Sequence, residues 1–254
     1  MTDKHLWSGD VELCAGRLVF HGRLGDAHRH LHAAVQVMVT AHGRMRLTDA
    51  SGVQRSSQAV IIPPGAEHEM AGNSVGTMMF IDPAARGARV LLGMVRQTGM
   101  ADTSCVAWDA AARPLLALAA RPDGASQSRA DAFLDVILED AKANPGVVHP
   151  SLKRATEVLP SMLNGPVRLD ELAAEVGISG SRLGHLFSDE FGLPFRAFVR
   201  WARLGAAMER ARTGGTLTDA AHAAGFSDSA HLTRVCHEMF GLRPSDLAGA
   251  VTWR

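Results

Sequence analysis

The sequence predicts an α+β protein of two domains: a small β-barrel over residues 1–110 and an all-α domain over residues 149–254, joined by a helical connector over residues 111–148. Two observations predict this division. Before about residue 110, short apolar segments alternate with turn residues, as in small barrels and sandwiches. After that point, apolar positions recur at helical spacing. A chain of 254 residues with 46% hydrophobic residues is long enough to form both cores.

Composition and charge exclude several classes of protein. Apolar runs such as 33–39 are far shorter than the roughly 20 residues of a membrane-spanning helix. No export signal is visible at the N-terminus, so we expect a cytoplasmic protein without a membrane partner. The three cysteines, Cys14, Cys105 and Cys236, are widely spaced and exclude a disulfide scaffold or a zinc finger. A formal net charge of zero excludes a basic chain that grips nucleic acid by bulk charge.

The strands and connector helices are predicted from two different periodicities. In the connector, residues 112–120 and 129–143 carry apolar side chains at helical spacing. Those side chains serve either a dimer interface, which would make a homodimer, or packing within the chain, and the sequence leaves both open. The predicted strands of the N-terminal domain, bounded by glycine-containing turns, are 11–20, 33–40, 44–47, 53–62 and 75–81.

The all-α part contains an internal repeat. Residues 169–177 (LDELAAEVG) match residues 217–225 (LTDAAHAAG) at an offset of 48. Residues 191–193 and 240–242, both FGL, match at an offset of 49. The one-residue difference lies within the turn, where an insertion costs least. The chain therefore holds two copies of one unit, over about 169–191 and 217–240.

Each copy has the pattern of a helix-turn-helix unit. In the first unit, Gly177 follows an amphipathic helix, and glycine readily adopts the left-handed conformation that ends a helix. Ser179 is then a good N-cap for a second helix. Gly225 and Asp228 take these places in the second unit. The long apolar stretch over about 194–213 predicts a helix that bridges the units. Such helix pairs present their second helix to the major groove of DNA.

These residues also carry a family resemblance. The pattern L-x-E-L-A-x-x-x-G-x-S from Leu169, then GFSDSAHLTR from Gly225 and FGLRPS from Phe240, resembles the C-terminal domain of AraC/XylS-type transcriptional regulators. The resemblance covers about residues 150–250. It implies a sequence-specific transcriptional regulator whose partner is double-stranded DNA, with two recognition helices placed in successive major grooves.

The resemblance indicates which side chains reach DNA. Arg234 and His185 occupy equivalent positions, and the matching family positions contact base edges. Arginine bound to guanine O6 and N7 is the commonest specific contact; a phosphate contact or an ion pair is the alternative for Arg234. Arg182 and His231 lie one residue away from that face, which favours phosphate contacts. The predicted DNA-binding residues are Ser181, Arg182, His185, Ser229, His231, Thr233 and Arg234.

Two departures from the family pattern affect this expectation. Gly180 and Gly184 lie in the first recognition helix, where glycine weakens the helix and has no side chain to reach a base. We therefore expect the first helix to read few bases directly. Cys236 stands where the family usually has an aromatic core residue.

The N-terminal domain contains a candidate metal site. His28, His30, His32 and Gln36 alternate along one segment, and a P-P-G-A-E-H motif ends at His68. The arrangement resembles the two cupin motifs, which implies a cupin-like domain holding a divalent metal such as Zn, Ni, Fe or Cu. The predicted ligands are His28, His30 and His68, with His32 or Gln36. The carboxylate ligand of the cupin pattern is missing, and Gln36 is nearest to its place.

Three interpretations of these histidines stay open: a metal site, a metal-free pocket that binds a small organic effector, and a purely structural role. In the first two, occupancy of the pocket shifts the population able to bind DNA. The alternative function is a metal-dependent cupin enzyme or a small-molecule-binding protein with a helical interaction domain. We expect no enzyme, because no G-x-S-x-G motif frames a serine and no feature supplies a substrate group.

Overall fold

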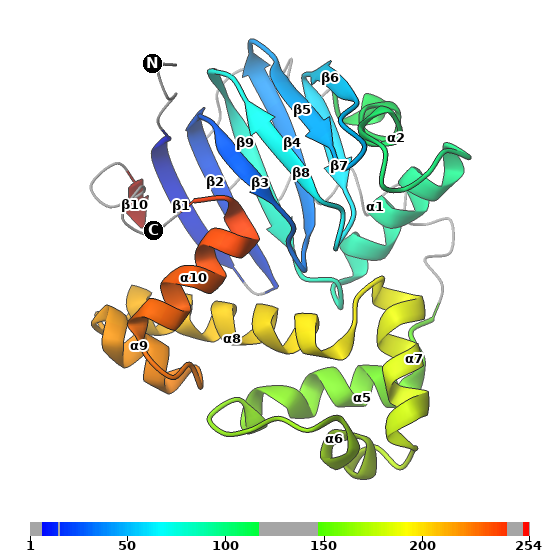
Figure 1. Ribbon diagram of the computed structural model, residues 1–254, viewed down its shortest axis with the longest axis vertical. Helices are drawn as coiled ribbons and strands as arrows, with labels where there is room; N and C mark the ends of the chain where they lie inside the picture. Colours follow the sequence, from blue (N-terminus) through cyan, green and yellow to red (C-terminus); the bar gives the residue numbers. More distant parts are fainter. Residues whose placement is uncertain (1–6, 15, 117–146, 243–250, 254) are drawn as a thin grey trace.

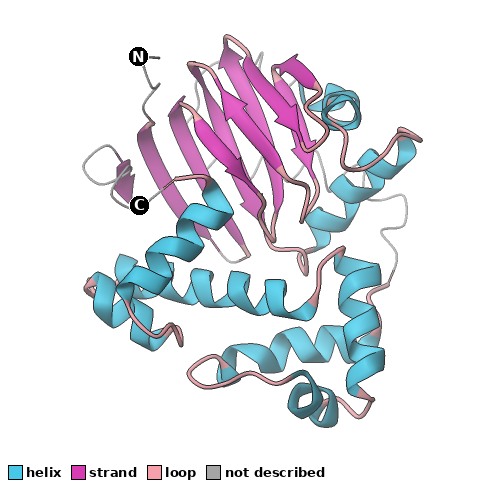
Figure 2. Ribbon diagram, viewed as in Figure 1, coloured by secondary structure: helices cyan, strands magenta, loops and turns pink. Residues whose placement is uncertain are grey.

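The computed structural model describes residues 7–14, 16–116, 147–242 and 251–253 of the chain. Strands gather in one half of the molecule, and the helices of the C-terminal part lie in the other half (Figures 1 and 2). This arrangement confirms the predicted fold class of a β-rich N-terminal domain and a helical C-terminal domain. Among the described residues, no helix is both long enough and apolar enough to cross a membrane.

The strands of the β-rich domain form two sheets and do not close into one barrel. The larger sheet has the order β10-β1-β2-β9-β4-β7, and the smaller has the order β3-β8-β5-β6. Neighbouring strands are antiparallel except β1 and β10, which are parallel, so residues 251–253 return to the N-terminal domain. The strands are β1 Ser8–Cys14, β2 Arg17–Leu24, β3 Ala27–His30, β4 Val35–His42, β5 Met45–Asp49, β6 Gln54–Ser57, β7 Ala59–Ile62, β8 His68–Ala71, β9 Ser74–Ile81 and β10 Val251–Trp253.

The predicted strands differ from the observed ones in three ways. The predicted strand 11–20 contains the end of β1, a turn at Gly16 with φ +73°, and the start of β2. The predicted strand 53–62 is two strands, β6 and β7, which belong to different sheets. Strands β3, β8 and β10 were not predicted. Strands β3 (AHRH) and β8 (HEMA) are four residues long, contain charged and histidine side chains and lack an apolar run, and β10 lies within the predicted all-α domain.

Two helices follow the sheets where the sequence analysis predicted none. Helix α1 (Arg86–Gln97) buries Leu91 and Val95 on one face, and Ser104 caps helix α2 (Cys105–Ala111) by accepting a hydrogen bond from Val106 N. A short 3-10 helix, η1 (Arg113–Leu115), comes next. The rest of the predicted connector helices, with most of the candidate dimer interface, lies outside the described residues, and the homodimer stays a prediction.

The helices after residue 147 agree closely with the predicted helix-turn-helix units. The bridging helix predicted over about 194–213 is α8, capped by Pro194 and Thr213. The observed bounds are α5 Pro150–Val158, η2 Leu159–Met162, α6 Leu169–Glu175, α7 Gly180–Phe191, α8 Phe195–Arg212, α9 Leu217–Ala223 and α10 Ser229–Phe240.

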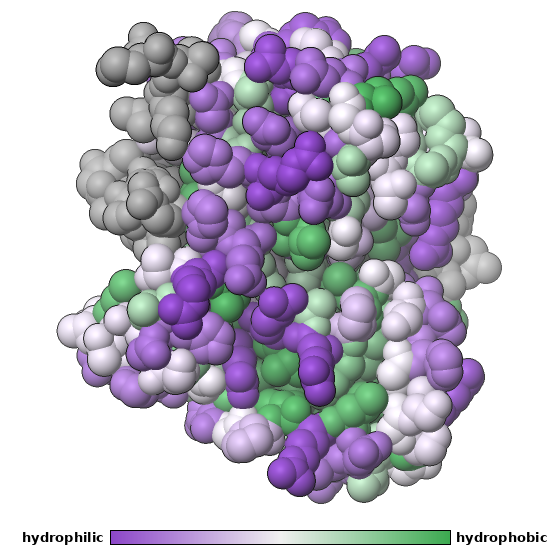
Figure 3. Space-filling model, viewed as in Figure 1, coloured by the Kyte–Doolittle hydropathy of each residue, from purple (hydrophilic) through white to green (hydrophobic). Residues whose placement is uncertain are grey.

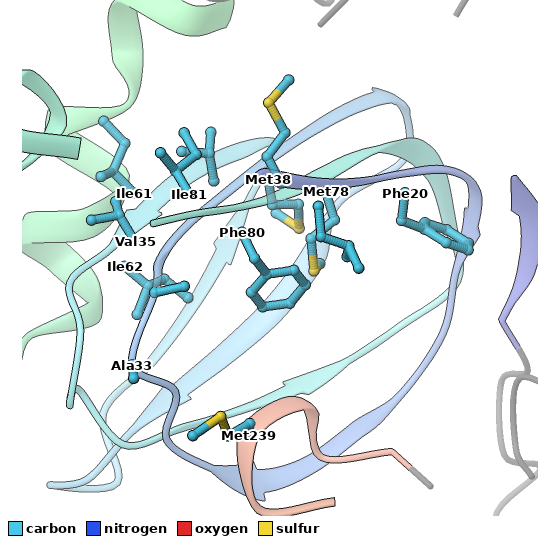
Figure 4. Close-up of a cluster of buried hydrophobic side chains, with 14 of the residues drawn as sticks. Phe20, Ala33, Val35, Met38, Ile61, Ile62, Met78, Phe80, Ile81 and Met239 are labelled. Carbon is cyan, nitrogen blue, oxygen red and sulfur yellow. The ribbon is translucent and has the colours of Figure 1, made fainter. Parts of the chain in front are cut away.

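The buried apolar residues form two clusters, and these do not coincide with the two domains. One cluster joins the β-rich domain to the second helix-turn-helix unit, and Figure 4 draws Met239 of α10 among side chains that include Phe80 and Ala33. The other cluster holds α5, α6, α7 and the start of α8 together. On the face drawn in Figure 3, apolar residues (green) gather over α5 and α8, where this second cluster lies. The second unit is thus packed as part of the β-rich domain.

Candidate functional site

The first helix-turn-helix unit consists of α6 and α7. Gly177, with φ +72°, adopts the left-handed conformation that ends α6. The Ser179 hydroxyl accepts a hydrogen bond from Arg182 N and caps α7, as the sequence predicts. Leu183 and Phe187 on α7 are fully buried, which fixes the opposite face of the helix toward solvent.

The second unit, α9 and α10, has the same local construction. Thr216 and Asp219 form a reciprocal capping box at the start of α9. Gly225 follows α9 with φ +74°, and Asp228 caps α10 by accepting a hydrogen bond of 2.6 Å from His231 N. Both predicted caps and both predicted glycine turns are therefore confirmed.

The predicted DNA-binding residues lie on the outer faces of α7 and α10. Thr233 donates its hydroxyl to Ser229 O, and the His231 ring contacts the Ser227 hydroxyl at 3.2 Å. These contacts orient the two side chains along the helix. Of the seven predicted DNA-binding residues, the exposed ones are Ser181, Arg182, His185 and Arg234, and the half-buried ones are Ser229, His231 and Thr233.

The structure gives a reason for one glycine of the first recognition helix. A Cβ atom at Gly180 would overlap the Asp170 carboxylate of α6. The nearest backbone atom, Asp170 Cα, would be at an ordinary contact distance of 3.6 Å, so a side chain at position 180 would require the Asp170 carboxylate to rotate away. Gly184 is less restricted, because an added Cβ atom would meet only Leu169 Cδ2, at 3.3 Å.

Both recognition helices end against the β-rich domain. Each has a left-handed glycine at its C-terminal end, Gly192 with φ +70° on α7 and Gly241 with φ +65° on α10. A Cβ atom at Gly241 would lie 2.6 Å from His28 O and 2.8 Å from His30 Nδ1. A Cβ atom at Gly65 would lie 4.0 Å from Gly192 O. The two helix ends thus contact the two segments that carry the predicted metal-ligating histidines.

Two further contacts hold the helices to this surface. The rings of Phe80 on β9 and Phe240 on α10 meet edge to face at 4.8 Å. Trp201 Nε1 on α8 donates to the Asp82 carboxylate at 3.3 Å. Burial raises the pKa of Asp82, and hydrogen bonds from Ala84 N and Trp201 partly oppose this effect.

Three buried histidines, His30, His32 and His68, meet at the junction between the β-rich domain and α10. One ring nitrogen of each lies within 4.8 Å of those of the other two. The Nδ1 atom of each histidine contacts a backbone carbonyl oxygen. His30 contacts His28 O at 2.6 Å, His32 contacts Ala34 O at 2.7 Å, and His68 contacts Ala66 O at 3.0 Å.

These backbone contacts determine which nitrogen is available to a ligand. When Nδ1 donates its proton to a carbonyl, Nε2 carries the free lone pair that binds a metal. The Nε2 atoms of His32 and His68 are buried and have no hydrogen-bond partner. Unpaired buried nitrogens are costly unless something binds them. The donor set therefore fits a divalent transition metal held by three imidazoles.

Burial keeps the three histidines neutral, which is the form that binds a metal. Desolvation lowers the pKa of His30 to about 4 and that of His32 to about 3. The pKa of His68 is also well below its usual value, because of desolvation and then the neighbouring His30 and His32.

The cluster corrects the predicted ligand set in one position. His28 is exposed and lies outside the cluster, whereas His32, the predicted additional ligand, is fully buried within it. The pairing of β3 with β8 shifts register between Ala27 and His30, so two consecutive residues, His28 and Arg29, face outward. Simple alternation along a regular strand does not hold across such a bulge.

Gln36, the other additional candidate, lies beside the cluster. It is fully buried on β4, and its Nε2 contacts Met70 Sδ and Met78 Sδ at 3.2 and 3.3 Å. Its Oε1 atom is buried without a hydrogen-bond partner. The Gln36 amide also adjoins His32. Burial and then the neighbouring His30 lower the pKa of His32, and the Gln36 side chain opposes them.

An apolar cavity of about 150 Å³ lies next to the cluster, between the β-rich domain and the second helix-turn-helix unit. Its walls come from β-strand residues such as Phe20 and Met78 and from helix residues such as Leu204 and Phe240, and His30 lines it as well. The effector pocket was predicted inside the N-terminal domain alone. The helical share of the lining was missed, although Leu204, Ala207 and Ala211 form a stripe at helical spacing on α8.

Comparisons with known proteins agree with this architecture. Residues 172–249 match a family described as a helix-turn-helix domain. ToxT from Vibrio cholerae has a similar fold, with a TM-score of 0.57, 12% sequence identity, and coverage of 91% of this chain and 97% of that chain. A structure of unsaturated fatty acid bound wild-type ToxT from V. cholerae is also similar, with a TM-score of 0.56, 13% identity, and coverage of 94% and 97%. A comparison with curated proteins found no match.

Proposed function

We propose that this chain is an AraC/XylS-type transcriptional regulator that binds a specific sequence in double-stranded DNA through α7 and α10. The matched helix-turn-helix domain and the fold shared with ToxT support this proposal. The observation that carries the proposal is the pair of units at the two ends of α8, each with an exposed recognition face. We propose a regulator without a catalytic role, and a DNA partner implies a cytoplasmic location.

The length of α8 supports contacts with successive major grooves. Its 18 residues correspond to a helix about 27 Å long. This separation is comparable to the roughly 34 Å between major-groove positions one helical turn apart. In this arrangement Arg234 and His185 reach base edges, and Arg182 and His231 contact phosphates. Ser181, Ser229 and Thr233 complete the two surfaces.

The test replaces Arg234, the exposed arginine expected to bind guanine. We expect Arg234→Ala to weaken specific binding by roughly 1–3 kcal/mol and to relax the sequence preference. Electrophoretic mobility shifts with a cognate promoter fragment and with scrambled DNA measure both effects. Arg46→Ala is the matched control, because it removes an exposed arginine from β5, which is not packed against α7 or α10. Equal losses in the two variants would contradict a specific role of Arg234.

We further propose that a small apolar effector occupies the cavity between the domains and modulates DNA binding. The cavity walls belong to both the β-rich domain and the second unit, so a bound molecule contacts elements of each. A ligand with different affinities for two arrangements of these elements shifts their populations. The unsaturated fatty acid bound to the structurally similar ToxT supports an apolar ligand class for this chain too.

A divalent transition metal is the second proposed effector. Zn, Ni, Fe and Cu all suit imidazole ligands, and the proposed ligands are His30, His32 and His68, beside Gln36. The observation that favours a metal over purely structural histidines is the pair of unpartnered, buried Nε2 atoms of His32 and His68.

Metal analysis of purified variants tests this proposal. We expect the parent protein and His28→Ala to retain stoichiometric metal after dialysis, because His28 lies outside the cluster. We expect His32→Ala and His68→Ala to lose it. Plasma mass spectrometry measures the content, and circular dichroism verifies that each variant is folded. Negligible metal in the parent protein after supplementation with Zn²⁺ would refute the site, and loss in His28→Ala alone would restore the original ligand set.

A further inference from the structure

The polar side chains of the apolar cavity include two that adjoin the histidine cluster. Apart from Trp7, whose Nε1 already donates to Asp26 O, the described lining residues with side-chain nitrogen or oxygen are His30 and Gln36. His30 belongs to the cluster, and Gln36 adjoins His32. A molecule that fills the cavity therefore has its polar end beside the three histidines.

The described part of the cavity wall contains no lysine or arginine. An ionised head group that enters it loses its hydration, and no side chain there supplies the opposite charge. Such a transfer is strongly unfavourable unless the charge is paired. An acid thus requires a positive charge from another source.

We propose that the cavity and the histidine cluster form one composite site, in which a divalent metal held by His30, His32 and His68 binds the carboxylate of an apolar acid. The inference rests on the proposed effector function and names its ligand class. Zinc sites with three protein ligands keep a position open for a further ligand. The metal supplies the positive charge that the described cavity wall lacks. The apolar chain of the acid contacts side chains such as Met78 and Phe240.

The composite site makes affinity for the acid dependent on metal. Octanoate and 1-octanol are suitable probes, because they share an apolar chain and differ in the charge of the head group. We expect octanoate to bind the Zn²⁺-loaded protein at least tenfold more tightly than the protein stripped with EDTA. We expect 1-octanol to bind both forms equally. Isothermal titration calorimetry on the full-length chain measures all four affinities.

His32→Ala provides a variant that separates the two parts of the site. His32 is in the cluster but does not line the cavity, so the variant is expected to lose the effect of Zn²⁺ on octanoate while retaining 1-octanol binding. Retained 1-octanol binding also demonstrates an intact cavity. Equal affinity of octanoate for loaded and stripped protein overturns the composite site, as does failure to take up Zn²⁺. Binding of 1-octanol in either case leaves the proposed apolar effector site standing.

Discussion

The three clustered histidines make the stability of the metal-free protein dependent on pH. Their folded-state pKa values are lowered, to about 4 for His30 and about 3 for His32, from the usual value of about 6.5. Below about pH 6.5 the unfolded chain therefore binds protons that the folded chain does not. Stability is fully present above this pH and falls as the pH decreases, by up to about 1.4 kcal/mol per pH unit for each histidine.

Urea unfolding of EDTA-treated protein at pH 7.5, 6.5 and 5.5 measures this loss. We expect His68→Gln to flatten the dependence, because it removes one of the buried groups that must stay neutral. His42→Gln is the control, since His42 is exposed on β4. An unchanged slope in His68→Gln would contradict the assignment of the acid sensitivity to this cluster.

At the same scale, the histidine cluster illustrates how far residue patterns alone can predict a site. Spacing and motif placed His30, His68 and His32 among the candidates, and these are the three residues that the structure brings together. The choice between His28 and His32 depended on a bulge in β3, which follows from pairing with β8 and not from the local sequence. Periodicity predicts which residues alternate, but only the partner strand determines where the alternation is interrupted.

Among the secondary-structure elements, those with local signals were predicted best. The N-caps Ser179 and Asp228, and the glycines after α6 and α9, fixed the bounds of both helix-turn-helix units. Strands β3 and β8 have no such signals; they pair with each other, and β8 also pairs with β5. The apolar cavity depends on the packing of α8 and α10 against distant strands, so no local pattern predicts it.

The turn glycines of the two units are expected to differ in their tolerance of substitution. Both have positive φ, but a Cβ atom at Gly177 would meet nothing within 4 Å, whereas one at Gly225 would overlap Leu163 O. Gly177→Ala should cost about 1–2 kcal/mol of stability from the left-handed backbone alone. Gly225→Ala should cost roughly 1–3 kcal/mol more, because the turn must move away from Leu163. Urea unfolding of both variants measures the difference, and equal costs would contradict this packing.

For the whole molecule, the shared apolar cluster indicates that the β-rich domain and the second unit act as one body. The first unit has its own core and touches the β-rich domain near Gly65. The C-terminal ends of α7 and α10 contact the two histidine-bearing segments. A metal that joins those segments therefore also connects the surfaces against which the two recognition helices end. Coupling between two sites is reciprocal: if a change at a helix end alters metal affinity, metal binding must alter the free energy of that helix end by the same amount.

Gly241→Ala tests this linkage from the DNA-binding side. The added methyl group would press on His28 O and His30 Nδ1, 2.6 and 2.8 Å away, and disturb the hydrogen bond that orients the His30 ring. Loss of such an orienting contact typically lowers metal affinity about 10–100-fold, and we expect a Zn²⁺ affinity reduced in this range. Gly192→Ala imposes the same left-handed strain on α7 without a contact within 4 Å, so it should leave Zn²⁺ affinity unchanged. Competition with a fluorescent chelator measures both affinities. If the two variants bind Zn²⁺ equally well, α10 does not support the metal site, and the second unit cannot respond to metal through its C-terminal end.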